Sequence, residues 1–166
     1  MSDLSLVLRH EVPSDHPAID RLHERAFGPG RFARTAYRLR EGVAHEASLS
    51  FTALVGTLIV GSIRLTRIRI GAEPGLLLGP VTVDPAFTSR GIGLSLVNRS
   101  LEAARAEGHR LVVLVGDAPF YVRAGFVPVP HGRLSMPGPV DPGRLLVCEL
   151  EPGAFSGVSG AILPAL

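Results

Sequence analysis

Residues 88–95 read Thr-Ser-Arg-Gly-Ile-Gly-Leu-Ser and place two glycines directly before a helical pattern. From Leu94 to Ala104, apolar residues recur every three or four positions, as they do along one face of a helix. The first amides of a helix have no acceptor within the helix, and the helix dipole makes that end electropositive, so it attracts anions. Glycine lets a ligand come close to the backbone, and Arg90 and Ser95 add donors. The stretch therefore predicts a phosphate site at the start of a helix.

Two common phosphate-binding motifs do not fit this stretch. A Walker loop is excluded, because no Gly-Lys-Ser or Gly-Lys-Thr follows a glycine-rich run. The dinucleotide fingerprint places its glycines directly after a strand, whereas residues 84–90 separate Val83 from Gly91, and Leu96 stands where the third glycine is required. From these residues alone, an ordinary helix start that contains two glycines remains the alternative.

Histidine and cysteine, the other residue types that often carry chemistry, show weaker patterns. The histidines at positions 10, 16, 23, 45, 109 and 131 have no paired metal-ligand spacing, so we expect no metal site. Cys148 alternates with Leu146 and Leu150, so we expect it to point into the core as a small apolar residue.

Composition narrows the class of protein. The chain has 166 residues, of which 46% are hydrophobic and 19% charged, and its formal net charge is +2. These values indicate a folded protein and do not favour a nucleic-acid partner. A single cysteine fits a reducing compartment, and the first residues lack the pattern of a signal peptide. The apolar stretches at 53–61 and 154–166 are too short to span a bilayer, so we expect a cytoplasmic protein without a membrane partner.

The elements that must position the glycine turn alternate between strands and helices. Pro17 lies near the start of one predicted helix, and Gly28 lies at its end. The strand-like runs of residues between positions 47 and 83 suggest neighbouring antiparallel strands. We predict strands at 4–12, 49–56, 57–70, 76–83, 111–116 and 145–151, and helices at 15–28, 32–39, 91–107 and 118–124. The pattern indicates one α+β domain over residues 1–166.

Two segments are less defined in the sequence. Residues 132–144 are dense in proline and glycine and are predicted to form a loop. The uncharged tail from Ala154 could cover apolar surface of its own domain or of a neighbouring subunit, and the sequence leaves both open, as it does a monomer or a homodimer.

Residues 88–93 resemble the pyrophosphate-binding loop of the GCN5-related N-acetyltransferase (GNAT) superfamily. The family signature is Gln or Arg, two residues, Gly, any residue, then Gly or Ala, and only Thr88 departs from it. Residues 76–87 resemble the family's fourth strand and the Asp-Pro turn after it, and residues 116–129 resemble its second signature, which carries Phe-Tyr and a Gly-Phe step. The Pro-Gly-Pro loop and closing strand near the C-terminus are similar to those of the small bacterial branch of the family.

The resemblance implies the acyl-CoA N-acyltransferase fold, a three-layer arrangement in which helices flank a mixed, mostly antiparallel sheet of about six to seven strands. It implies acetyl-CoA as cosubstrate and direct transfer of the acetyl group to an amine of a small molecule or protein. Tyr121, in the Phe-Tyr position, would act as the acid and lie at the cofactor. The other residues implied to bind acetyl-CoA are Val81, Thr82, Val83, Thr88, Ser89, Arg90, Gly91, Ile92, Gly93, Leu94 and Ser95.

The general base and the acceptor remain open in the sequence. An amine with a pKa of about 10.4 is less than about 0.1% neutral at pH 7, so a proton must be removed from it. Glu46, Glu73 and Asp117 are candidates, and a water chain is an alternative. Two other functions also remain, an acyl-CoA-binding module without turnover and a transferase for a longer acyl group.

Overall fold

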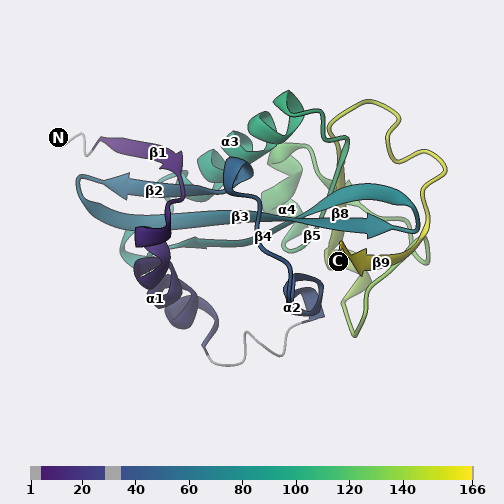
Figure 1. The fold of residues 1–166 in the computed structure, drawn as a ribbon, viewed down its shortest axis with the longest axis horizontal. Coiled ribbons are helices and arrows are strands. Elements are labelled where there is room, and N and C mark those ends of the chain that lie inside the picture. The colour runs from purple at the N-terminus through teal and green to yellow at the C-terminus, as the bar shows by residue number, and fades with distance from the viewer. Residues whose placement is uncertain (1–4, 29–34, 166) are drawn as a thin grey trace.

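The structure is a computed structural model that describes residues 5–28 and 35–165 (Figure 1). The N-terminal part contains strand β1 (Leu6–His10), helix α1 (His16–Phe27) and helix α2 (Thr35–Arg40). Helix α1 has proline in its first turn and ends at Gly28, whose φ of +64° places it in the left-handed region. Both helix predictions are confirmed, although Phe32 of the second one lies outside the described residues. Each helix among the described residues is too short or too polar to cross a membrane.

The middle of the chain forms the predicted meander. Strands β2 (Phe51–Val55), β3 (Leu58–Ile70) and β4 (Glu73–Val83) are antiparallel neighbours. Helix α3 (Ile92–Ala106) then crosses over to β5 (Leu111–Val115), which is parallel to β4. The chain continues through α4 (Ala118–Tyr121), β6 (Val127–Pro128) and β8 (Leu145–Glu149), with β5 and β8 antiparallel.

Strands of the described residues follow the order β1-β2-β3-β4-β5-β8-β6, which confirms a mixed, mostly antiparallel sheet. The parallel pair is short, because β4 and β5 align only at Leu76 with Val112 and at Leu77 with Val113. Beyond these pairs, β4 runs on to Val83 without β5 beside it. The backbone of β4 from Leu78 onward therefore presents an edge that a ligand can pair with.

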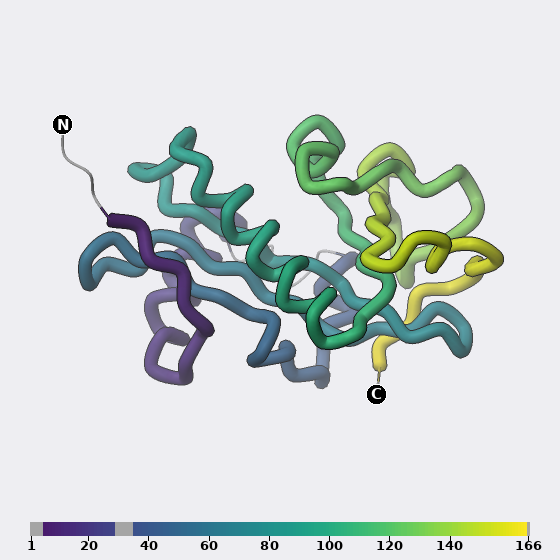
Figure 2. Tube along the Cα trace, turned by 90° about the horizontal axis from the view of Figure 1, so that it is seen from above, coloured from purple at the N-terminus to yellow at the C-terminus, as the bar shows by residue number. Residues whose placement is uncertain are grey.

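Helices cover the sheet on both sides, so the three-layer prediction is also confirmed. Figure 2 shows α3 running across one face of the sheet. The cluster beneath α3 is apolar and includes Phe51, Ile63, Leu65 and Leu96, all at most 1% exposed. Helices α1 and α2 lie on the opposite face, where α1 buries Ile19, Leu22 and His23.

Two short strands were not predicted. Strand β7 (Leu134–Ser135) lies inside the proline-rich loop, and β9 (Gly160–Pro164) lies in the uncharged tail. Strand β9 pairs antiparallel with the end of β3 and parallel with β7. Phe155, Val158 and Ile162 are buried in an apolar cluster on the face opposite α3. Of the two alternatives for the tail, the structure therefore shows that it covers apolar surface of its own chain.

Candidate active site

The glycine turn lies between the free end of β4 and the start of α3. Gly91 precedes the first helical residue, with a φ of +78°, and no side chain caps this helix end. A Cβ built on Gly91 would meet no protein atom within 4 Å. Ser89 also has a left-handed backbone, with a φ of +64°, which is uncommon for a residue other than glycine. The turn therefore presents open backbone amides in a conformation that is costly to hold without a function.

Side chains around the turn hold its shape. Asp84 accepts a hydrogen bond from the amide of Ala86 at 2.9 Å and forms an ion pair with Arg25 of α1 at 3.0 Å. The Thr88 hydroxyl donates to the carbonyl of Pro85 at 3.1 Å. The Arg90 guanidinium lies over the Phe87 ring, 5.3 Å from its centroid, and Arg90 is exposed. Thr88 therefore stabilises the turn, and the exposed Arg90 guanidinium adds a positive charge beside it.

The first turn of α3 packs closely behind the glycines. Ile92 is buried in the apolar cluster, and Leu94 and Ser95 are half-buried. The amide of Ser95 donates to the carbonyl of Gly91 at 3.0 Å, so the helix ladder begins there. A Cβ on Gly93 would lie 3.4 Å from the Phe120 ring. The second glycine therefore lies at the contact between α3 and α4, where a Cβ would be in van der Waals contact with Phe120.

Side chains of the free β4 edge alternate between the two faces of the sheet. Val81 and Val83 pack on the apolar cluster beneath α3, whereas Thr82 is 4% exposed and points to the opposite face. These side chains fix the strand, and its backbone groups on the β5 side remain available. A bulge precedes this edge, where Gly79 and Pro80, joined by a cis peptide bond, lie opposite the single residue Arg64 of β3.

Tyr121 lies at the C-terminal end of α4 with its ring among other aromatic rings. Its ring centroid is 4.8 Å from that of Phe120 and 5.9 Å from that of Phe126. Gly116 permits this position, because a Cβ there would lie 2.5 Å from Cε2 of Tyr121. Burial raises the pKa of the Tyr121 phenol, and the nearby Asp117 adds to this effect while Arg144 opposes it. The hydroxyl therefore stays protonated at neutral and mildly alkaline pH.

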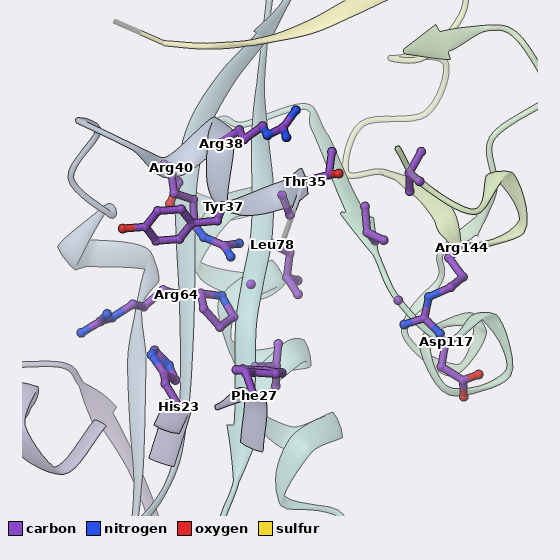
Figure 3. Close-up of a pocket in the computed structure, with 18 of the residues that line it drawn as sticks. His23, Phe27, Thr35, Tyr37, Arg38, Arg40, Arg64, Leu78, Asp117 and Arg144 are labelled. Carbon is purple, nitrogen blue, oxygen red and sulfur yellow. The ribbon is translucent and has the colours of Figure 1, made fainter. Parts of the chain in front are cut away.

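A cavity of about 1220 Å³ connects these parts (Figure 3). Its walls come from α1, α2, β3, the bulge of β4, the end of α4 and the segment 139–144. Val81 and Tyr121 line one side of it, and His23, Tyr37 and Arg38 line the side of the first two helices. Of the predicted site residues, the cavity thus contains Val81 and Tyr121, while the glycine turn lies beyond it at the end of β4.

The three predicted candidates for the base are separated in the structure. Glu46 forms an ion pair with Arg67 at 3.0 Å, and Glu73 lies 3.5 Å from Arg110 at the far end of β4. Neither lines the cavity, whereas Asp117 does. The structure therefore leaves Asp117 as the one of these three carboxylates that an acceptor in the cavity could reach.

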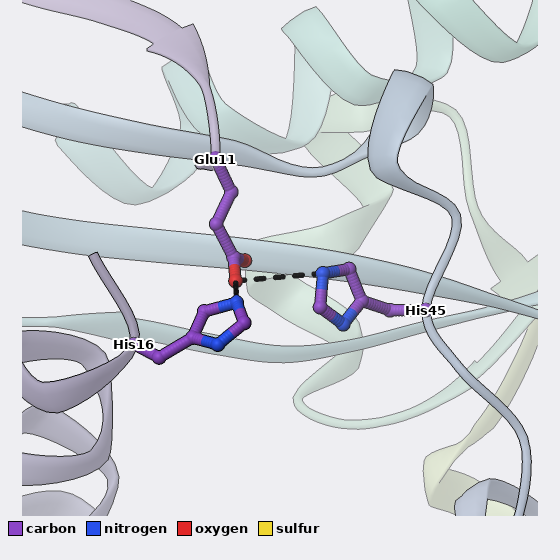
Figure 4. Close-up of side chains that lie close together, drawn as sticks. All are labelled: Glu11, His16 and His45. Atoms are coloured by element: carbon purple, nitrogen blue, oxygen red, sulfur yellow. Dashed lines mark ion pairs between the residues drawn. The ribbon is translucent and has the colours of Figure 1, made fainter. Parts of the chain in front are cut away.

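Sequence spacing missed a cluster around Glu11 (Figure 4). The buried carboxylate of Glu11 lies 2.9 Å from Nε2 of His16 and 3.4 Å from Nε2 of His45. These donor types are ones that bind metals, and the three groups lie within 4.8 Å of one another. However, the guanidinium of Arg64 donates to both carboxylate oxygens, at 2.9 and 2.8 Å. Because a bound metal would have to displace or lie beside this cation, we interpret the cluster as an ion-pair network.

Cys148 is buried in the apolar cluster beneath α3, as predicted. Burial raises the pKa of its thiol. Because the thiolate is the reactive form, this environment is that of a structural cysteine.

Comparisons with known proteins agree with this geometry. Residues 16–126 match the model of the Acetyltransferase (GNAT) family. The N-acetyltransferase YhbS of Escherichia coli K12 is 28% identical over 159 residues, which cover 95% of each chain. The N-acetyltransferase YjhQ of the same strain is 31% identical over 130 residues, covering 76% of this chain and 71% of YjhQ.

Solved structures show the same fold. The crystal structure of E. coli YhbS in complex with CoA superposes with a TM-score of 0.84 at 26% identity, covering 99% of this chain and 92% of that one. A GNAT-family acetyltransferase from Brucella melitensis in complex with acetyl-CoA has a TM-score of 0.62 at 28% identity, covering 92% and 99% of the two chains. The predicted family and fold are thereby confirmed, and the chain belongs to the GNAT family of acetyltransferases.

Proposed function

We propose that this chain transfers an acetyl group from acetyl-CoA directly to an amine held in the cavity. The proposal rests on three adjoining features. The free edge of β4 ends at the open glycine turn, and Val81 of this edge lines the same cavity as Tyr121. The similar structures from E. coli and B. melitensis contain CoA and acetyl-CoA, respectively, which supports this cosubstrate.

The glycine turn fits a pyrophosphate. Its first helical amides are uncapped, Gly91 leaves open space, and Arg90 is exposed beside it. Helix dipole and amides together favour an anion at this position. We assign the pyrophosphate to the turn and its flanking positions, Thr88, Ser89, Arg90, Gly91, Ile92, Gly93, Leu94 and Ser95.

The pantetheine arm fits the free edge of β4. An extended amide chain can pair with a strand edge through main-chain hydrogen bonds. We assign this pairing to the backbone of Val81, Thr82 and Val83, whose side chains are occupied with packing on the two faces of the sheet.

Tyr121 is proposed as the general acid. Acetyl-CoA supplies the acetyl group as a thioester, and the sulfur must receive a proton when it leaves. The Tyr121 phenol lines the cavity, and its raised pKa keeps the proton in place until it is needed. We further propose that residues 1–166 act as one domain in the cytoplasm, as a monomer or homodimer, without a membrane or nucleic-acid partner.

The first test measures cosubstrate binding. Acetyl-CoA at about one hundred times its dissociation constant should stabilise the fold by about 2.7 kcal/mol and raise the melting temperature. Gly91→Ala should greatly reduce this ligand-dependent rise, because a methyl group would intrude where the phosphate approaches. Gly108→Ala is the matched control, since Gly108 also has a left-handed φ, +85°, and open space around its Cβ position. Equal ligand-dependent rises in both variants would place the pyrophosphate elsewhere.

The second test measures turnover as thiol release over a panel of amines. Release that depends on an amine supports the transferase. Binding of acetyl-CoA without release for any amine would instead indicate an acyl-CoA-binding module. Faster release from a longer thioester would assign a different acyl donor.

A further inference from the structure

Glu11 is a buried carboxylate surrounded by cationic or ionisable side chains. Its side chain is 1% exposed, and Arg64 binds both of its oxygens. The two histidines approach the same oxygen, Oε2, from different sides. His16 is 47% exposed and does not line the cavity, whereas His45 is 24% exposed and does. The same carboxylate thus contacts one histidine at the surface and one in the cavity wall.

His45 lies in the wall of the cavity in which acetyl transfer is proposed. It lies in the connection between α2 and β2, next to Arg64, which faces the Gly79–Pro80 bulge at the start of the free β4 edge. His45, Arg64, the bulge and Tyr121 all line the same cavity. An amine bound in this cavity would therefore share it with His45.

One ring nitrogen of His45 is already oriented by the protein. Nε2 approaches Glu11, and Figure 4 shows the second nitrogen, Nδ1, pointing away from the carboxylate. Nδ1 has no partner among the described residues. A carboxylate beside Nε2 favours the tautomer that carries its proton there, which leaves the Nδ1 lone pair free to accept a proton.

Charges around His45 keep it neutral but able to take up a proton. Burial lowers the pKa of His45, and electrostatic interaction with Arg64 and His16 lowers it further, whereas Glu11 and Glu46 act in the opposite direction. The imidazole is therefore uncharged at pH 7, and Glu11 lies where it stabilises the charge that forms when a proton arrives.

We propose that His45 is the general base of this enzyme and that Glu11 is its positioning residue, an assignment that rests on the proposed transferase function. In this step, an N–H bond of the acceptor ammonium breaks, the proton forms a bond with Nδ1 of His45, and the electron pair stays on the amine. The neutral amine then attacks the thioester carbonyl, and the C–S bond breaks as Tyr121 gives its proton to the leaving sulfur. The acylated nitrogen loses its second proton, which restores the Tyr121 phenol, and His45 returns its proton to water. Arg64 binds both oxygens of Glu11 and so holds in place the carboxylate that orients the His45 ring.

The central experiment compares His45→Gln with His16→Gln. Both variants remove a histidine from the same carboxylate oxygen, but only His45 lines the cavity. For an amine with a pKa near 10, His45→Gln should lower kcat/KM at pH 7 by about one hundredfold or more, the usual contribution of general base catalysis. His16→Gln should stay within about threefold of the parent, and the acetyl-CoA-dependent rise in melting temperature should be the same in both variants.

A second acceptor separates loss of a base from loss of structure. An amine with a pKa below about 5 is already neutral at pH 7 and needs no base to become so. The His45→Gln defect should therefore shrink at least tenfold with this amine. A merely structural role would cost both amines equally.

Glu11→Gln tests the positioning role through the pH dependence of kcat/KM with the strongly basic amine, the reaction that needs His45 as a base. Without the carboxylate, the imidazolium is less stable, so the acidic limb due to His45 should move to lower pH. This variant leaves Arg64 without its partner, so the His45 variants, which keep that ion pair, decide the proposal if Glu11→Gln does not fold.

Two outcomes overturn the assignment. Parental kcat/KM in His45→Gln with the strongly basic amine would do so, as would equal losses in His45→Gln and His16→Gln. Failure of the proposed function is a different result, because the parent enzyme would then release no thiol with any amine. That result would overturn the assignment of His45 together with the function.

Discussion

Helices α3 and α1 cover opposite faces of one sheet, and the side chains beneath them differ in kind. Beneath α3, the strands contribute Phe51, Ile63, Leu65 and their neighbours to a continuous apolar cluster. Beneath α1, the same strands contribute Thr52, Ser62, Arg64, Thr66 and Thr82. On the face opposite α3, this polar region lies beneath α1, and a second apolar cluster that includes Ile68, Ile70 and Leu77 covers the other end of β3 and β4.

The difference shows how stability and chemistry are divided. Burial of apolar side chains beneath α3 stabilises the fold and fixes the end of β4 and the glycine turn. On the other face, charged groups are held by partners, such as Asp15 by Arg9 at 2.7 Å, while the hydroxyls of Ser62 and Thr82 have no hydrogen-bond partner among the described residues. This polar layer is costly to bury, and it lies next to the cavity in which we propose that the amine binds.

Tyr121 belongs to both regions, because its ring packs on the apolar cluster and the residue also lines the cavity. Tyr121→Phe keeps the ring and removes the proton, so turnover should fall by about one hundred to ten thousandfold. The melting temperature and its acetyl-CoA-dependent rise should change little. In the parent, activity should decline only above pH 10, because burial raises the pKa of the phenol, and the variant should lack this decline. Turnover of at least half the parental value, with chemistry rate-limiting, would make Tyr121 a packing residue.

The packed face should respond to loss of volume. Leu96 of α3 is fully buried, and Leu96→Ala should lower the free energy of unfolding by about 2–5 kcal/mol, as measured by denaturant titration. Leu58, which is 54% exposed at the start of β3, provides the control, and Leu58→Ala should cost less than about 0.5 kcal/mol. Similar losses in the two variants would contradict the assignment of α3 to the stabilising face.

The polar face should respond to pH. Hydrogen bonds from Arg9, Val12 and Thr52 lower the pKa of Asp15 from 3.8 to about 2, although burial opposes them. Because the folded pKa is the lower one, the stabilisation of about 2 kcal/mol is present above pH 4 and is lost as the pH falls toward 2. Stability measured from pH 5 to pH 2 should therefore fall in the parent more steeply than in Asp15→Asn. Glu102→Gln, at a side chain that is 76% exposed, should retain the parental pH dependence.

The smallest effect is expected at Thr82. Its hydroxyl is buried without a partner, so Thr82→Val should leave the free energy of unfolding unchanged or raise it. Acetyl-CoA binding should also be unchanged, because the proposed contact uses the backbone of Thr82. Thr52→Val is the matched control and should cost about 1–3 kcal/mol, since the Thr52 hydroxyl donates to Asp15 at 3.1 Å. A clear loss in Thr82→Val would show that this hydroxyl has a function on the polar face.

Elements with a strong local pattern could be predicted from the sequence. Helix α3 follows from its apolar spacing and from Gly91, and the meander follows from β-branched runs separated by turns. Strands β7 and β9 could not be predicted, because β7 has only two residues and β9 has only three residues between Gly160 and Pro164. Their pairing depends on the end of β3, which lies far away in the sequence.

The same limit applies to the candidate site, where residues with a local signature could be predicted and residues that only the fold brings together could not. The glycine turn and Tyr121 lie within short signatures, so their residues could be named in advance, and their roles stay predictions. The cluster of Glu11, Arg64 and His45 has no local signature, because its members come from three separate elements and meet only through the sheet. The histidine spacing that speaks against a metal site carries no information about a histidine paired with a distant carboxylate.

The attachment of the tail has a consequence for how this site can change during evolution. Strand β7 is tied to β9, and Arg133 donates to the carbonyls of Phe155 and Val158. The loop that follows β7 supplies Pro139, Val140 and Asp141 to the cavity wall, and β8 begins at Leu145. Since this loop is anchored at both ends, its middle can accumulate substitutions without disturbing the sheet, the glycine turn or Tyr121. On the proposed function, substitutions in this loop change one wall of the acceptor cavity while Tyr121 and the glycine turn stay the same, so acceptor preference can diverge within the loop as acetyl transfer is retained.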